Sequence, residues 1–210
     1  MSMERKNRWE LWVVMALAFA LLALWGLRVS KNGPSDRFLK AQRSAPAFSL
    51  LDQEGKKFSS DTLKGKVWVV DFIFTRCAGS CPLLSGKMRQ LQAQWKGNDD
   101  LKLVSISVDP EYDKPSVLKK YAEGLQADPD QWTFLTGEKA DVYDVIQKGF
   151  QVTAEKDPDE PKGFEFVHST RMILVDANGM IRGLYNGDEE GDVHKLQRDI
   201  HFLMSSKDKS

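Results

Sequence analysis

Two cysteines stand close together in the chain and are its clearest candidates for chemistry. Cys77 and Cys81 lie in the run FTRCAGSCP (74–82), between an apolar stretch (67–74) and a segment with helical spacing. We therefore expect both thiols at a strand-to-helix turn. The partial positive charge of a helix N-terminus, together with Arg76, favours the thiolate form. A thiolate is the nucleophile of disulfide exchange and also a ligand for soft metals, so the pair predicts redox or metal chemistry.

The spacing of the pair favours the metal. Thioredoxin-type oxidoreductases have two residues between their cysteines, whereas three residues separate Cys77 from Cys81. The longer loop still permits a disulfide, but it also allows both sulfurs to converge on one ion. Cuprous copper prefers soft thiolates and accepts few ligands, whereas structural zinc takes four. No further cysteine or histidine is clustered with the pair, and three ligands therefore suit copper better than zinc.

His168 is the candidate for the third ligand. Thioredoxins place a cis-proline opposite their cysteines, just before the third core strand. The matching stretch here reads GFEFVHSTRMILVD (163–176) and contains no proline, because the last proline of the chain is Pro161. In a thioredoxin-like fold, His168 is expected to face the cysteine loop from the neighbouring strand. Asp109 and Asp144 are candidates for acids that support the site from outside the ligand set.

Other uses of the cysteine pair stay open from the residues alone. In a thiol-disulfide reductase, Cys77 would attack a client disulfide and Cys81 would resolve the mixed disulfide. A thiol peroxidase shares the expected fold, but its Thr-x-x-Cys setting is not matched by FTRC (74–77). A purely structural disulfide is disfavoured, because closing so small a loop constrains the unfolded chain little.

The elements that position these residues follow from the hydrophobic pattern. VWVVDFIF (67–74) is a continuous apolar run, as expected for a central strand covered on both faces. Pro82 fits the first turn of the helix that follows. The alternation of strands and helices predicts an α/β, thioredoxin-like domain over 46–205 with helices on both sheet faces. The expected strands are two within 47–59, then 67–74, 101–108, 132–135 and a hairpin over 171–185; the expected helices are 82–95, one from about 115, 139–150 and 192–204; a surface loop is expected over 154–163.

An N-terminal transmembrane helix is expected to precede the domain. Residues 11–27 carry no charge, and about 17–25 apolar residues cross a bilayer as a helix. Basic residues before this anchor suggest a cytoplasmic N-terminus (1–10), and polar residues 28–45 read as a tether. No small-x-small motif follows the anchor, which favours retention over signal-peptide cleavage. The expected location is the cell inner membrane, single-pass, with the soluble domain on the periplasmic side.

Composition excludes some partners and leaves room for one domain. The 210 residues contain 30 Lys plus Arg and 30 Asp plus Glu, which gives no reason to propose nucleic-acid binding. Two cysteines are too few for the disulfide framework of a small secreted domain. The apolar fraction of 41% supports a packed core.

Three motifs in this order resemble the Sco/SenC family: FTRCAGSCP (74–82), SISVDPEYDKP (105–115) and VHSTRMILVDANG (167–179). The resemblance covers about residues 45–205 and the anchor. It implies a membrane-tethered thioredoxin fold that binds copper through two cysteines and a histidine. It also implies assistance in assembling the dinuclear copper centre of cytochrome c oxidase, with the copper-bearing subunit as partner. Cys77, Cys81 and His168 match the family's ligands.

One position departs from the family pattern. Many members have Pro-Asp after the first cysteine, whereas this chain has Ala78-Gly79. The change removes a carboxylate near the site and makes the loop more flexible. We expect it to affect copper affinity, or the balance between metal and disulfide chemistry, and to leave the ligand set unchanged.

Overall fold

The computed structural model describes residues 12–17, 43–77, 79–152, 154–156, 166–168 and 170–207. The chain divides into two units, Met1–Lys40 and Ala41–Ser210. In the first unit, residues 12–17 are helical and their side chains are exposed. Among the described residues, no helix combines the length and apolarity needed to cross a membrane. The expected cytoplasmic terminus (1–10), the rest of the anchor (11–27) and residues 28–42 of the expected tether (28–45) lie outside the described residues. The last residues of that tether belong to the second unit, where Arg43 and Ser44 form a strand.

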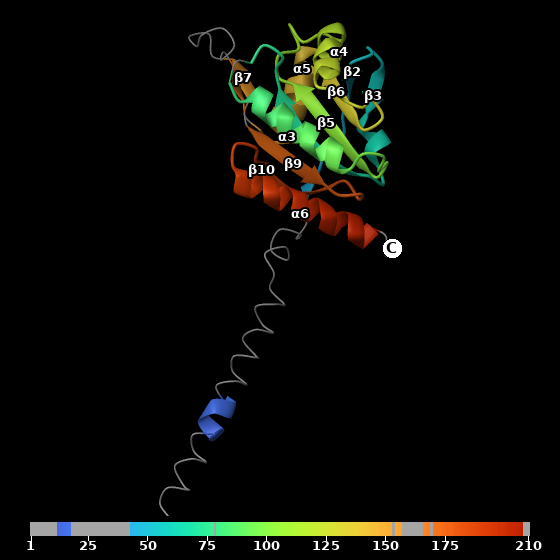
Figure 1. Ribbon diagram of the computed structural model, residues 1–210. Coiled ribbons are helices and arrows are strands. Elements are labelled where there is room, and N and C mark those ends of the chain that lie inside the picture. The colour runs from blue at the N-terminus through green and yellow to red at the C-terminus, as the bar shows by residue number, and fades with distance from the viewer. Residues whose placement is uncertain are drawn as a thin grey trace, which may run out of the picture. The chain divides into compact units, whose positions relative to one another are not determined.

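A single mixed sheet of eight strands organises the second unit (Figure 1). Its strand order is β1-β10-β9-β4-β5-β6-β2-β3. Strands β4, β5 and β6 are parallel neighbours, and the remaining pairs are antiparallel. The strands are β1 (Arg43–Ser44), β2 (Ser49–Asp52), β3 (Lys57–Ser59), β4 (Val67–Ile73), β5 (Leu101–Ser107), β6 (Trp132–Thr136), β9 (Arg171–Val175) and β10 (Met180–Asn186).

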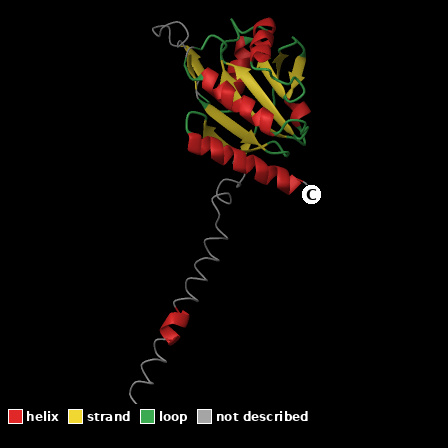
Figure 2. Cartoon of the chain, in the orientation of Figure 1, coloured by secondary structure: helices red, strands yellow, loops and turns green. Residues whose placement is uncertain are grey.

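Helices cover both faces of this sheet, as the sequence predicted (Figure 2). On one face, α3 (Cys81–Gln94) contacts α4 (Pro115–Gly124) through Ser85 and Tyr121, and contacts α6 (Glu190–Lys207) through Lys87 and Glu190. On the other face lie α5 (Lys139–Tyr143) and the π-helix η2 (Asp144–Gly149). The structure also contains a short 3-10 helix, η1 (Ser60–Leu63).

The central strand β4 is buried along its whole length, which explains its continuous apolar sequence. Trp68 and Phe72 both make edge contacts with Phe150, which follows η2, and they belong to one face of the strand. Because side chains alternate across a strand, Asp71 belongs to the opposite face, which α3 and α4 cover. The cysteines follow the carboxyl end of this strand, and the core holds that end in place.

A separate two-stranded sheet differs from the expected surface loop. Strands β7 (Ala154–Lys156) and β8 (Phe166–His168) pair antiparallel, with Ala154 opposite His168. The loop prediction was therefore wrong for 154–156, which lie in a strand, and residues 157–163 lie outside the described part. The helix expected over 139–150 is also different, because it continues after α5 as a π-helix.

Candidate copper site

The two thiols lie at the turn between β4 and α3. The backbone N–H of Cys77 donates to Phe74 O at 3.2 Å, which closes a tight turn directly after β4. Cys81 is the first residue of α3, and Pro82 occupies the first turn, where its missing N–H leaves no bond unmade. Both cysteines are thiols; Cys77 is half-buried and Cys81 is buried. The position of both cysteines between a strand and a helix agrees with the prediction. Ala78, between them, lies outside the described residues.

The pKa of Cys81 differs from the sequence expectation. Its position at a helix N-terminus predicted a lowered value. In the structure the pKa of the Cys81 thiol is raised, first by its hydrogen bond with the Cys77 side chain and then by burial. The pair is therefore held as neighbouring thiols, and a metal that binds them must displace a proton from the buried one.

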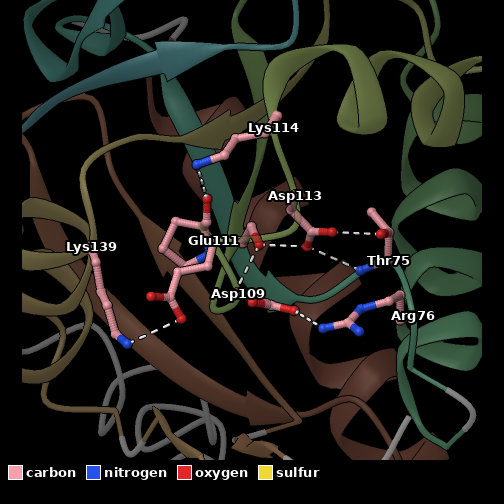
Figure 3. Close-up of polar contacts among 9 residues, drawn as sticks. Thr75, Arg76, Asp109, Glu111, Asp113, Lys114 and Lys139 are labelled. Carbon is pink, nitrogen blue, oxygen red and sulfur yellow. Dashed lines mark hydrogen bonds and ion pairs between the residues drawn. The ribbon is translucent and has the colours of Figure 1, made fainter. Parts of the chain in front are cut away.

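Asp113 holds the chain just before Cys77 (Figure 3). Its carboxylate accepts hydrogen bonds from the Thr75 backbone N–H at 3.1 Å and from the Thr75 hydroxyl at 2.5 Å. Ser107, the last residue of β5, donates a third bond at 2.6 Å. Burial raises the pKa of Asp113 despite these donors. The carboxylate thus ties the cysteine turn to the end of the neighbouring strand.

Arg76, the next residue of the turn, contacts two residues of the same segment (109–113) that holds Thr75. Its guanidinium donates to Asp109 Oδ2 at 2.6 Å and lies over the Tyr112 ring, 4.1 Å from the centroid. Asp109 is buried, so this ion pair is shielded from solvent on one side. The charge of Arg76 is therefore balanced by a carboxylate. Asp109 thus contacts the residue beside Cys77, whereas its support of a metal site stays a prediction.

Asp71 is a buried acid that the sequence analysis did not select. It has no exposed surface, and Ser105 Oγ donates to its Oδ1 at 2.5 Å. Among the described residues, its Oδ2 has no hydrogen-bond partner. Burial raises the pKa of Asp71 to about 7, and its charge also raises the pKa of Cys81. The signal in the sequence was a single charged residue inside an otherwise apolar strand.

Asp113 and Tyr112 were also missed as site residues, although both lie in the motif SISVDPEYDKP (105–115) that carries the family resemblance. Asp144, in contrast, was a candidate that the structure does not bring to the turn. Its side chain is 61% exposed and forms an ion pair with Lys148 at 2.7 Å along η2. This exposed pair belongs to the surface of the π-helix.

His168 is the last residue of β8, so its backbone belongs to the hairpin that leaves the domain after Val152. The placement of its side chain lies outside the described part of the structure. Among the described residues, no group of three metal-binding side chains occurs. His194 is exposed and lies 3.6 Å from Glu190, and His201 contacts Trp95, so both belong to the surface or core edge, as expected.

The donor set suits a soft metal. Two neighbouring sulfurs, one of them buried, match the thiolate preference of cuprous copper. The site also has a rigid frame, because Asp113 and Asp109 fix the two residues that precede Cys77. The same pair of thiols is suited to forming a disulfide across the turn.

Comparison with known proteins agrees with the resemblance drawn from the motifs. The family model described as SCO1/SenC matches residues 37–205. A SCO1 protein homolog from Bacillus subtilis is 36% identical over 162 residues, which cover 76% of this chain and 82% of that protein.

Two solved structures extend the comparison. BsSco, described as a member of the Sco family of cytochrome c oxidase assembly proteins with a disulfide switch, is 34% identical with a TM-score of 0.64; the match covers 75% of this chain and 91% of that one. ScoI of Bradyrhizobium japonicum, solved with copper bound, is 30% identical with a TM-score of 0.61; the match covers 74% of this chain and 99% of that one. The copper-bound relative agrees with the copper prediction.

Proposed function

Because the chain belongs to the SCO1/SenC family, we propose that it is a copper chaperone that assists assembly of the copper centre of cytochrome c oxidase. Cys77, Cys81 and His168 are the proposed ligands. The observation that carries this proposal is the thiol pair at the turn between β4 and α3, where Asp113 and Asp109 hold the two residues that precede Cys77. The copper bound to the Bradyrhizobium relative supports it.

Copper is cargo in this proposal, and the protein's own groups set the conditions for holding it. The raised pKa of Cys81 means that binding releases a proton, so affinity increases with pH. A disulfide between Cys77 and Cys81 removes both sulfur donors. The oxidation state of the pair therefore acts as a gate on copper loading.

A membrane anchor over residues 11–27 completes the proposal. It would keep the domain on the periplasmic side, near a membrane-embedded oxidase. The apolar length of the segment and the basic residues that precede it support this placement. The copper-bearing oxidase subunit is the proposed partner.

Copper affinity of point variants tests the ligand set. Full-length chain, purified in detergent and kept reduced without oxygen, is titrated with Cu(I) against a competing chelator. We expect one copper per chain, with a large loss of affinity in Cys77→Ser and Cys81→Ser and a smaller loss in His168→Ala. His201→Ala is the matched control, because its ring contacts Trp95 at the C-terminal end of α3, whereas Cys81 begins that helix. Unchanged affinity in His168→Ala would remove that residue from the ligand set.

A second candidate is thiol-disulfide reduction of exported proteins. The observation that favours it is the half-buried Cys77 beside a buried Cys81, the arrangement needed for an attacking and a resolving thiol. Copper-free, reduced chain is mixed with a disulfide-bonded peptide, and peptide thiols are counted. Two results together would favour this function over the first. The wild type would reduce the peptide rapidly while Cys81→Ser stops at a mixed disulfide, and copper affinity would be unchanged by His168→Ala.

A further inference from the structure

The hairpin that carries His168 has two connections to the domain. It leaves after Val152, which is buried and bonded to η2, and it returns at Thr170, just before β9. Its strands β7 and β8 pair only with one another among the described strands. Since Ala154 lies opposite His168 in this pairing, β7 sets the position of the His168 backbone. The direction in which the chain enters β7 is therefore one of two constraints on the position of the His168 backbone, and the return connection at Thr170 is the other.

Arg43 fixes this entry. Its guanidinium donates two hydrogen bonds, one to Gly149 O at 2.8 Å and one to Phe150 O at 2.6 Å. These carbonyls end the π-helix η2, where the helix leaves carbonyl groups without intrahelical partners and carries partial negative charge. Arg43 is itself held in β1, opposite Ile181 of β10. A residue more than a hundred positions away in the sequence thus caps the helix before the hairpin.

The end of η2 is closely packed, which restricts its movement. A Cβ added at Gly149 would lie 2.7 Å from Pro46 Cβ, so the segment after β1 packs directly on η2. Phe150 is fully buried against Trp68 and Phe72. Gln151 follows with a φ of 56°, a left-handed turn that redirects the chain toward β7. The next residue, Val152, is buried, and its N–H donates to Ile146 O of η2 at 3.1 Å. The guanidinium therefore acts on the end of a helix to which the chain stays bonded through Val152.

The return connection is held by different residues. The backbone N–H of Gly187 donates to Thr170 O at 2.8 Å, and the Thr170 hydroxyl donates to Asn186 Oδ1 at 2.7 Å. These contacts do not involve Arg43. Loss of the guanidinium is thus expected to release one connection of the hairpin and to leave the other in place.

We propose that Arg43 is a positioning residue for His168: by capping η2 at Gly149 and Phe150 it orients the β7–β8 hairpin, and through it the third copper ligand. This inference rests on the proposed function. Arg43 also lies at the end of the segment 28–45 expected to tether the domain. One side chain thus joins the end of the expected tether to the end of η2, from which the chain continues toward the hairpin.

Copper titration of three arginine variants tests the proposal in the reduced full-length chain. Groups that orient metal ligands typically change affinity by ~10–100-fold when they are removed. We expect Arg43→Ala to weaken Cu(I) binding by about tenfold, because the return connection remains. Arg43→Lys should recover part of the affinity, since an ammonium group can still donate to these carbonyls. Arg89→Ala, which removes a surface hydrogen bond to Gln126, should leave affinity unchanged.

A double-mutant cycle separates positioning from a general structural role. If Arg43 acts through His168, Arg43→Ala should have no further effect on copper affinity in the His168→Ala background. Hydrogen exchange of the amides in 151–156 should rise in Arg43→Ala, while that of β4 and β5 stays slow. Copper affinity unchanged by Arg43→Ala, or lowered equally in both backgrounds, would overturn the proposal. If His168→Ala itself has no effect on affinity, the ligand assignment fails and this inference fails with it.

Discussion

At the scale of single residues, buried carboxylates define the surroundings of the cysteine turn. Asp113 and Asp109 each bind the segment that leads to Cys77, whereas Asp71 lies under α3 and α4 with one oxygen bonded to Ser105. Burying a carboxylate disfavours its charged form unless donors compensate. Asp71 accepts its bond from a neutral hydroxyl, whereas Asp109 accepts one from a guanidinium, and the pKa of Asp71 is raised to about 7. Each of these acids can therefore be tested separately.

Asp71→Asn should change how stability depends on pH. Below pH 3.8 the carboxyl is protonated in both states, whereas between 3.8 and about 7 only the unfolded state releases its proton. Wild-type stability therefore falls as pH rises through this window, at up to about 1.4 kcal/mol per pH unit from this group. Asn cannot ionise, so we expect the variant to gain stability relative to wild type as pH rises. Urea unfolding at several pH values from 4 to 8 measures this difference.

The exposed Asp99→Asn serves as the control, because it makes the same substitution at a side chain that is 89% exposed. Its difference from wild type should stay nearly constant with pH. A constant difference for Asp71→Asn as well would mean that Asp71 ionises in the folded chain as readily as in the unfolded one.

Asp113→Ala should both destabilise the domain and loosen the cysteine turn. Three hydrogen bonds to Thr75 and Ser107 are lost, and buried donors are left without an acceptor. We expect a loss of about 3 kcal/mol in the free energy of unfolding, with faster alkylation of Cys77. Glu111→Ala, two residues away, removes only the exposed pair with Lys139 and should cost under about 1 kcal/mol. Equal effects of the two substitutions would show that Asp113 does not clamp the turn.

At the scale of elements, the sequence predicted those with strong local patterns. The apolar run at β4, the spacing of α3 and the turn between β9 and β10 each follow from neighbouring residues, and all three were confirmed. Strand β1 was missed because two residues cannot display alternation, and its partner β10 lies far away in the sequence. Strand β7 was missed because its sequence is polar.

The frame of the candidate site was harder to predict than its chemistry. Cysteine spacing and the motif around His168 identified the proposed ligands from sequence alone. Thr75 donates to Asp113, and Arg43 donates to the end of η2. Both hydrogen bonds join segments that are distant in the sequence, so no local pattern predicts them. Contacts of this kind depend on the sheet order, which periodicity does not determine.

The packing between α3 and the turn after β10 gives a prediction at this scale. A Cβ at Gly187 would overlap the Leu84 side chain of α3 and lie 3.0 Å from Thr170 O. Gly187→Ala must therefore displace α3 or the return of the hairpin, and we expect a loss of about 1–3 kcal/mol in unfolding free energy. Gly191→Ala is the matched control, since no atom lies within 4 Å of its added Cβ. If thermal unfolding of both variants is the same, this close contact does not constrain the fold.

At the scale of the whole molecule, the proposed anchor determines where the copper site works. Deleting residues 11–27 should release the chain from the membrane, because this deletion removes the apolar segment and leaves residues 41–210 unchanged. We expect the full chain to stay in the membrane fraction after a carbonate wash and the deletion variant to be soluble, with equal copper binding. Mass spectrometry of the purified full chain checks whether the segment is retained. A full chain that is soluble, or that has lost residues 1–27, would refute the anchor.

The central claim is that Cys77, Cys81 and His168 together hold one copper ion. X-ray absorption of the reduced full-length chain, loaded with one equivalent of Cu(I), counts the sulfur and nitrogen atoms bound to the metal. We predict two sulfurs and one nitrogen in the wild type, two sulfurs without that nitrogen in His168→Ala, and an unchanged spectrum in His201→Ala. A nitrogen ligand that persists in His168→Ala, or a site with fewer than two sulfurs in the wild type, would contradict the claim.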